Sequence, residues 1–264
     1  MKKQRVFLIL LFSLFLAVSI FSGTVSAKGS KTRSNRNIPG WTMTFNDEFK
    51  SGTLDKSKYV RYWGKPSTGG AVSWWNGDSA LIVQDGYLRL KIAKENVTHN
   101  GIQYPYTAGG FTQLTEQTYG RWVVRARMPQ GAGTQGYISL WRQDFKWPPE
   151  IDFAEVRGSL PNENIFTQHY SAAGKHETEV SKLYESDYTN KFHEYTVIWE
   201  PGKLTWLVDG VQKFTTTQKF PAFPMVLAVG DLVGKCDSFS GCPQTTNVFP
   251  TYLDIDYIRI YKKA

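Results

Sequence analysis

Apolar and polar residues alternate with a period of two over many short segments of this chain. Residues 87–92 show the pattern clearly, and residues 122–128 repeat it with arginines on the polar face. Side chains on a strand point to opposite faces in turn, so each segment predicts a strand with one buried face.

Turn signals separate these segments. Asp209-Gly210 lies between residues 204–208 and 211–214, which predicts a tight β-hairpin. Residues 252–261 predict a long last strand, and residues 180–188 predict at most one or two helical turns. Many strands without a long amphipathic helix predict an all-β fold, a two-sheet antiparallel β-sandwich of jelly-roll type, in one domain over residues 39–264.

The first 27 residues have the features of a secretory signal peptide. Basic residues precede an apolar run over residues 6–21, and Val25-Ser26-Ala27 is a small-residue cleavage site. The alternative is an uncleaved membrane anchor, because the apolar run is long for a signal. No later segment approaches the roughly 18 apolar residues that span a membrane. We therefore expect a secreted, extracellular protein.

The formal net charge of +8 is concentrated outside the predicted domain. Three positive charges belong to the signal, and residues 28–38, a basic flexible arm, carry four more and no acid. The arm is either a solvated linker or a contact to anionic cell wall or lipid. Because the domain itself is nearly neutral, a nucleic-acid partner is excluded.

Cys236 and Cys242 are the two cysteines of the chain. In an oxidising compartment, this short spacing predicts a disulfide that closes a small loop. A metal pair is disfavoured because no histidine lies nearby in the sequence.

Three acidic residues, Glu150, Asp152 and Glu155, lie in an apolar, β-prone segment. On a regular strand Glu150 and Asp152 share a face and Glu155 points away, but one β-bulge returns Glu155 to that face. Two glutamates placed in this way can hold their carboxyl groups about 5–5.5 Å apart, as in retaining glycosidases. The alternatives are a solvated edge strand and a calcium-binding patch.

Several segments, in this order, resemble glycoside hydrolase family 16, the laminarinase and lichenase group. They are residues 45–49, 85–90, 108–110, 119–129, 192–201, 207–210 and 256–261, together with the acidic motif. The resemblance implies a concanavalin A-like jelly roll and an endo-β-glucanase. It also implies that Glu150 is the nucleophile and Glu155 the general acid/base, with Asp152 between them. The two residues between Asp152 and Glu155 resemble the bulged, laminarinase-type branch.

Aromatic residues make up 15% of the chain, a surplus that suits a cleft for sugar rings. Trp141 and Trp147 are candidate sugar platforms, with core packing as the alternative. Trp75 and Asn76 lie in a glycine-rich stretch that is typical of a loop beside a cleft. His169 is expected on the next strand, level with the acidic motif. The remaining assignments are core for Trp122, Trp199 and Trp206, and surface or structural roles for His99, His176 and His193.

No cofactor is expected for catalysis. The resemblance implies a structural calcium ion on the convex side, with the Asp256 side chain and backbone oxygens near Glu48 and Gly86 as ligands. Oxygen ligands suit this hard cation.

The expected activity is cleavage of β-1,3 or mixed β-1,3-1,4 glucan by a monomer. Pro148-Pro149 and Ala154 depart from the usual laminarinase motif, so other polysaccharides stay open. The alternatives are a hydrolase of galactans such as agar or carrageenan, a transglycosylase, and a non-catalytic lectin. Because a lectin has no need for two paired glutamates, the motif favours an enzyme.

Overall fold

A computed structural model describes residues 36–67 and 70–264, and residues 37–264 form one compact unit. The predicted signal peptide, and residues 28–35 of the predicted arm, lie outside the described residues.

Two large antiparallel sheets contain most of the strands. The first is built from β1 (Trp41–Asp47), β5 (Leu81–Gln84), β6 (Tyr87–Ile92), β11 (Gly120–Arg127), β16 (His193–Glu200), β17 (Lys203–Val208), β18 (Val211–Thr217) and β20 (Thr251–Lys263). The second is built from β2 (Tyr59–Arg61), β10 (Gly110–Gln117), β12 (Thr134–Arg142), β13 (Glu150–Arg157), β14 (Glu163–Ala172), β15 (Lys175–Tyr184) and β19 (Met225–Val233).

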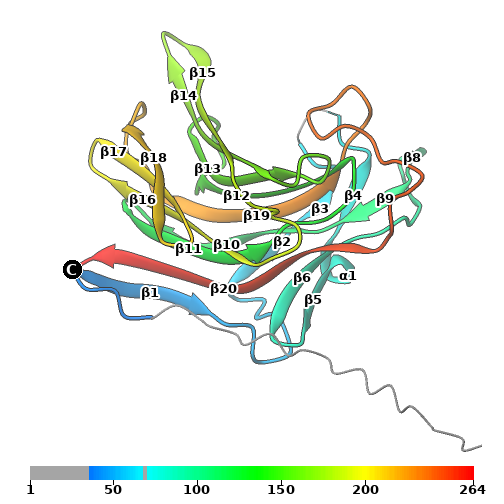
Figure 1. Ribbon diagram of the computed structural model, residues 1–264, viewed down its shortest axis with the longest axis horizontal. Helices are drawn as coiled ribbons and strands as arrows, with labels where there is room; N and C mark the ends of the chain where they lie inside the picture. Colours follow the sequence, from blue (N-terminus) through cyan, green and yellow to red (C-terminus); the bar gives the residue numbers. More distant parts are fainter. Residues whose placement is uncertain (1–35, 68–69) are drawn as a thin grey trace, which may run out of the picture. The chain divides into compact units, whose positions relative to one another are not determined.

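The strand order of the first sheet is β18-β17-β16-β11-β20-β6-β5, with β1 paired to β20. The order of the second is β15-β14-β13-β12-β19-β10-β2. Figure 1 shows the two sheets packed face to face, with the β14–β15 hairpin rising above the rest of the second sheet. The fold is therefore the predicted jelly-roll sandwich.

Smaller elements surround one end of the sandwich. A three-stranded sheet has the order β3 (Trp63–Gly64), β4 (Ser73–Asn76), β9 (Tyr106–Ala108). A two-stranded hairpin joins β7 (Val97–His99) to β8 (Ile102–Tyr104), and α1 (Gly77–Ala80) is one helical turn. Among the described residues no helix has the length and apolarity to cross a bilayer.

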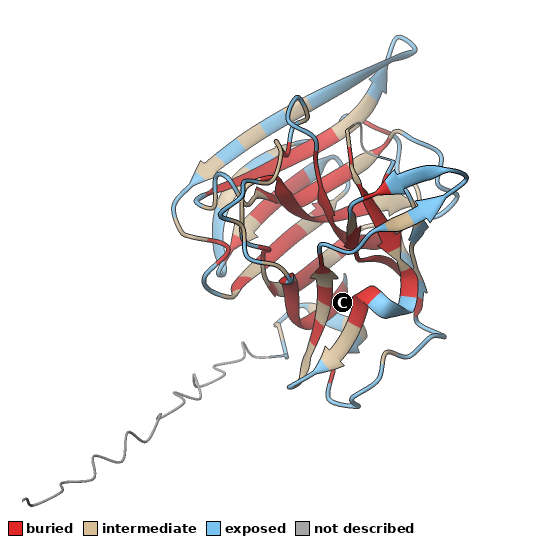
Figure 2. Cartoon of the chain, turned by 90° about the vertical axis from the view of Figure 1, so that its right-hand side faces the viewer, coloured by how far each residue is buried: buried red, intermediate tan, exposed pale blue. Residues whose placement is uncertain are grey.

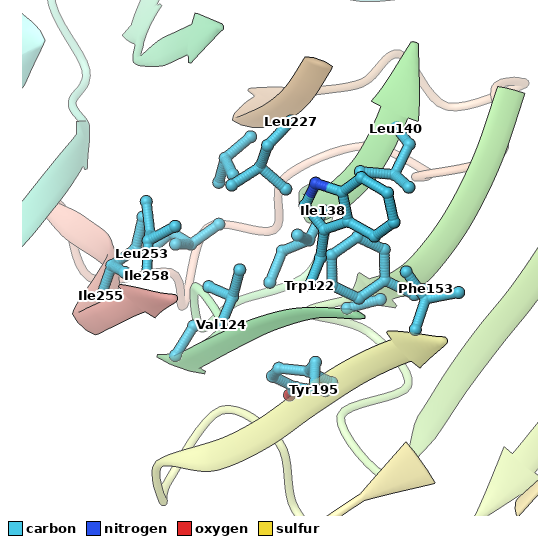
Figure 3. Packing of buried hydrophobic residues seen from close by; sticks show 14 of the residues in the cluster. Trp122, Val124, Ile138, Leu140, Phe153, Tyr195, Leu227, Leu253, Ile255 and Ile258 are labelled. Carbon is cyan, nitrogen blue, oxygen red and sulfur yellow. The ribbon is translucent and has the colours of Figure 1, made fainter. Parts of the chain in front are cut away.

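The hydrophobic core fills the space between the two large sheets. Figure 3 shows side chains from β11, β12, β13, β19 and β20 meeting there, among them Trp122, Ile138, Phe153, Leu227 and Leu253. Figure 2 shows the same division, with buried residues along the strands and exposed ones in the hairpins and loops. Alternate residues of each strand face this core, which explains the two-residue period of apolar residues in the sequence.

Several sequence predictions for single elements are confirmed. The segment 87–92 is β6, the hairpin at Asp209-Gly210 joins β17 to β18, and the long last strand is β20. The side chains expected in the core are fully buried: Trp122, Trp199 and Trp206.

Two local predictions are wrong. Residues 180–184 are not helical but complete β15, which pairs with β14 along its whole length. The half-buried positions of this part of β15 are Glu179, Ser181 and Leu183, so polar residues on the inner face hide the alternation. The stretch around Trp75 is likewise a strand, β4, rather than a loop.

Candidate active site

A β-bulge in β13 places the three carboxylates of the acidic motif on one face. Ala154 pairs with Ile138 on β12, whereas Asp152 pairs with Ser139, so Phe153 is the extra residue. Phe153 and Ala154 are both fully buried in the core, and the side chains of Glu150, Asp152 and Glu155 line a cleft on the opposite face. The predicted bulge is therefore confirmed.

Two indole groups hold the carboxylate of Glu150. Trp141 Nε1 donates to Glu150 Oε1 at 2.5 Å, and Trp147 Nε1 donates to Glu150 Oε2 at 2.8 Å. The Trp141 ring is stacked parallel to Tyr62 and Tyr137, which fixes its orientation. Both oxygens of this carboxylate therefore accept an indole N–H hydrogen bond, which holds the group in place.

The environment of Glu155 instead favours a proton. Burial, and to a smaller extent the negative charge of Glu150, raise the pKa of Glu155 to about 7. Two groups oppose this shift. Arg157 contributes its positive charge, and Gln135 Nε2 donates to Glu155 Oε1 at 2.8 Å. Near neutral pH this carboxyl group is therefore poised between its two protonation states.

Asp152 lies between the two glutamates at the end of a chain of polar contacts. Burial and the charges of Glu150 and Glu155 raise the pKa of Asp152 well above its usual range. Its Oδ2 lies 3.0 Å from His169 Nε2, and His169 Nδ1 lies 3.0 Å from His176 Nε2. Burial lowers the pKa of His169, which favours the neutral ring with one N–H.

These side chains line a cleft of about 800 Å³. Its walls combine aromatic faces with carboxylates and a few basic groups, and the lining residues include Trp75, Tyr137, Trp141, Arg142, Phe145, Lys146, Trp147 and His176. The side chain of Trp147 is about half exposed (53%), so its ring is available to a ligand. Aromatic faces suit the apolar faces of sugars, and carboxylates suit acid–base chemistry.

The structure brings most of the sequence-predicted site residues to this cleft. Trp75 is a lining residue although it is 8% exposed, and its Nε1 donates to the Asp231 carbonyl. His169 pairs with Glu150 across β13 and β14, as expected. Asn76 is not a lining residue; it is the last residue of β4 and pairs with Trp63 on β3.

Sequence reasoning did not identify Gln135, Tyr137 or His176 as parts of the site. Gln135 and Tyr137 share the alternation of β12 with Trp141, which is a usable signal once one of them is placed. His176 comes from the far strand of the β14–β15 hairpin, and its position depends on the hairpin register, which the sequence does not reveal.

Two places in the structure have side chains that could bind a metal ion. Glu150, Asp152 and His169 present atoms within 4.8 Å of one another, but these atoms are hydrogen-bonded to each other and to indole groups. On the first sheet, Asp256 Oδ2 accepts from Arg125 Nη1 at 2.7 Å.

The two acidic side chains at the expected calcium site, Asp256 and Glu48, are each paired with an arginine. Glu48 accepts from Arg259 Nε at 3.0 Å, and Gly86 lies in the turn between β5 and β6. Because a guanidinium already neutralises the Asp256 carboxylate, these side chains do not fit a tightly bound calcium ion. The expected structural calcium ion stays a prediction.

The predicted disulfide between Cys236 and Cys242 is present and closes a loop after β19. A Cβ atom at Gly133, just before β12, would lie 2.3 Å from the backbone of Cys242. The loop therefore packs directly against the strand that carries Gln135 and Trp141.

A jelly-roll sandwich whose cleft holds paired glutamates among aromatic rings defines the class of carbohydrate-active β-sandwich proteins. Residues 68–257 match the family described as glycosyl hydrolases family 16. The chain belongs to this family.

Two characterised relatives are named as an endo-β-glycanase and an endo-β-glucosidase. The chain is 28% identical to endo-1,3-1,4-β-glycanase EglC of Rhizobium meliloti over 83% of this chain and 51% of the relative. It is 26% identical to glucan endo-1,3-β-glucosidase A1 of Niallia circulans over 86% of this chain and 38% of the relative. The chain thus spans about half the length, or less, of these relatives.

The structural comparison agrees with the family. The laminarinase catalytic domain from Thermotoga maritima superposes with a TM-score of 0.76 at 25% identity, covering 85% of this chain and 99% of that domain.

Proposed function

We propose that this chain is a retaining endo-β-glycosidase that cleaves β-1,3 or mixed β-1,3-1,4 glucan. The observation that carries the proposal is the contrast between two glutamates on one face of β13. Glu150 accepts two N–H donors, whereas burial raises the pKa of Glu155 to about 7. Retaining hydrolysis needs this pair, an anionic nucleophile and a carboxylic acid.

In the first step, Glu150 attacks the anomeric carbon and forms a glycosyl ester. Glu155 donates its proton to the departing glycosidic oxygen, so the leaving sugar departs as a neutral alcohol. In the second step, Glu155 as a carboxylate accepts a proton from water. The resulting hydroxide oxygen attacks the anomeric carbon and releases Glu150, with net retention of configuration.

Asp152 acts beside the nucleophile in this scheme. Its raised pKa and its hydrogen bond to Glu150 support a protonated side chain that donates to Glu150. This donation adds to those from the two indole groups, so it orients the nucleophile and stabilises its charge whenever the ester breaks.

The substrate class rests on the cleft and on the relatives. Flat aromatic rings line the cleft, and the names of the two relatives specify 1,3-1,4-β-glycanase and endo-1,3-β-glucosidase activities. A sulfated galactan would favour unpaired cations, but Arg142 and Lys146 both contact Asp144. This pairing favours a neutral polysaccharide over a sulfated galactan such as carrageenan.

Export belongs to the same proposal, because a polymeric glucan is met outside the cell. It is supported by the basic, apolar and small-residue pattern of the first 27 residues.

The test is release of reducing sugar from laminarin, barley β-glucan, lichenan, agarose and κ-carrageenan, with Glu150→Gln as the matched inactive variant. We expect release from laminarin or the mixed-linkage glucans, abolished in the variant, and NMR of the first product to show the β-anomer. An α-anomer would contradict the retaining mechanism. Binding without release would favour the lectin, and longer products in place of release would favour the transglycosylase.

A further inference from the structure

The loop closed by Cys236 and Cys242 contacts Gln135 and Arg157, the two residues that lower the pKa of Glu155. Ser240 is 3% exposed, and its Oγ donates to Gln135 Oε1 at 2.5 Å. On its other side, the Gln135 amide donates to Glu155 Oε1 at 2.8 Å.

The direction of these two hydrogen bonds is linked. A glutamine side chain presents an oxygen acceptor at one edge of its planar amide group and an NH₂ donor at the other. Because the Ser240 hydroxyl donates to the oxygen, the NH₂ group must face Glu155. Without Ser240, the amide could rotate and present its oxygen to the carboxylate.

The same loop also contacts Arg157. The guanidinium of Arg157 lies 4.5 Å from the ring of Phe239 and donates to the Phe239 carbonyl at 3.5 Å. Arg157 also pairs with Glu163 at the start of β14. Its position near Glu155 is therefore held from the loop on one side and from β14 on the other.

We propose that the disulfide-closed loop, residues 236–242, is a positioning element for the acid/base, in which Ser240 fixes the Gln135 amide and Phe239 fixes Arg157. This inference rests on the proposed function, because it assigns a role to the surroundings of Glu155 in that reaction. None of residues 236–242 lines the cleft, so they act through Gln135 and Arg157.

The charges that face Glu155 give the sign of the effect. Glu150 and Glu163 favour the protonated form of Glu155, and Arg157 and the Gln135 donor favour the anion. Asp152 is the third carboxyl group of the cluster. Loosening the loop weakens only the effects of Arg157 and Gln135, so the pKa of Glu155 should rise. A smaller fraction of Glu155 is then ionised near neutral pH, and the second step needs the carboxylate form.

The test compares Ser240→Ala with Ser238→Ala in the same loop, whose hydroxyl donates to the Lys235 carbonyl and not to the site. In Ser240→Ala, we expect the basic limb of the kcat/KM profile to move up by about 0.5–1 pH unit, because one hydrogen bond to the charged form is lost. We expect kcat near neutral pH to fall several-fold, with KM little changed. Ser238→Ala should match the wild type.

Cys236→Ser with Cys242→Ser is the second variant, measured below its melting temperature. We expect its basic limb to move in the same direction as that of Ser240→Ala. A lower Tm with an unchanged pH profile in this variant, together with an unchanged profile in Ser240→Ala, would overturn the inference. If the wild type cleaves none of the polymers, the proposed function fails instead, so the two failures are distinguishable.

Discussion

Glu150 and Glu155 carry the same chemical group in two different environments. The first accepts two indole N–H donors, and the second loses hydration and faces another carboxylate. The two environments depend on different neighbouring groups, so each can be altered separately.

Trp147→Phe removes the donor to Glu150 Oε2 and keeps an aromatic ring in the cleft. Because a hydrogen bond to a charged group contributes about 1.5–3 kcal/mol, we expect kcat/KM to fall roughly 10- to 100-fold. The measurement is steady-state kinetics on the active polymer. Trp63→Phe is the matched control, since Trp63 is 67% exposed and is not a lining residue. Equal losses in both variants would contradict the role of the indole donor.

Glu155→Gln tests the acid/base through pH dependence. In the wild type, the proton of Glu155 is lost as pH rises through about 7, so kcat/KM should fall above that pH. The variant cannot titrate at this position, so its low activity should show no such limb. Substrates with good leaving groups, such as aryl glycosides, need little acid assistance and should retain more activity than glucans. A basic limb that persists in the variant would assign the titration to another group.

At the scale of elements, the β13 bulge and the β14–β15 hairpin decide which residues meet. The bulge turns Glu155 to the cleft, and the hairpin delivers His169 and His176 beside Asp152. The ring centroid of His176 also lies 4.3 Å from that of Trp147. His176 therefore contacts both Trp147, which donates to Glu150, and His169, which contacts Asp152.

His176→Gln and His176→Phe separate the two contacts of this histidine. The glutamine keeps a donor for His169 Nδ1, and the phenylalanine keeps only the ring against Trp147. If the donor fixes the His169 tautomer, kcat should fall about tenfold in the phenylalanine variant and stay near the wild-type value in the glutamine variant. The kinetics are compared with His99→Phe, a histidine that stacks on Trp74 outside the cleft. The reverse order of the two variants would assign the role to the ring.

At the scale of the whole molecule, one buried acid affects stability more than catalysis. Asp231 on β19 is fully buried, and its Oδ1 accepts from the Gly109 N–H at 2.7 Å. Its Oδ2 has no hydrogen-bond partner among the described residues. Burial raises the pKa of Asp231 to about 8.

Folding therefore binds a proton at Asp231 between about pH 4 and pH 8. The unfolded chain ionises first, so this group lowers the free energy of unfolding progressively as pH rises through that window. Asp231→Asn keeps the acceptor for Gly109 and cannot ionise. We expect its Tm to fall less than that of the wild type between pH 5 and pH 8, as measured by calorimetry. Parallel Tm curves for the two proteins would show that Asp231 does not titrate in this range.

The sequence predicts the sandwich well because apolar residues of strands such as β6 and β11 face one core. It also predicts the carboxylate face of β13, since the bulge leaves an extra apolar residue between Asp152 and Glu155. It misses β15, whose inner face is polar, and it misses His176 and Ser240, which reach the site through hairpin register and loop closure. Long-range contacts of this kind leave no local pattern.

The β15 strand also bears on how separate molecules meet. In the part of the chain that the structure describes, it is the outer strand of its sheet, and no strand pairs with its outward edge. Exposed charged residues of both signs lie along it, namely Lys175, Glu177 and Lys182. Another chain that added a strand here would have to bury those charges, which discourages edge-to-edge aggregation. Because His176 of this strand lines the cleft, the same charges also discourage another chain from pairing beside the cleft.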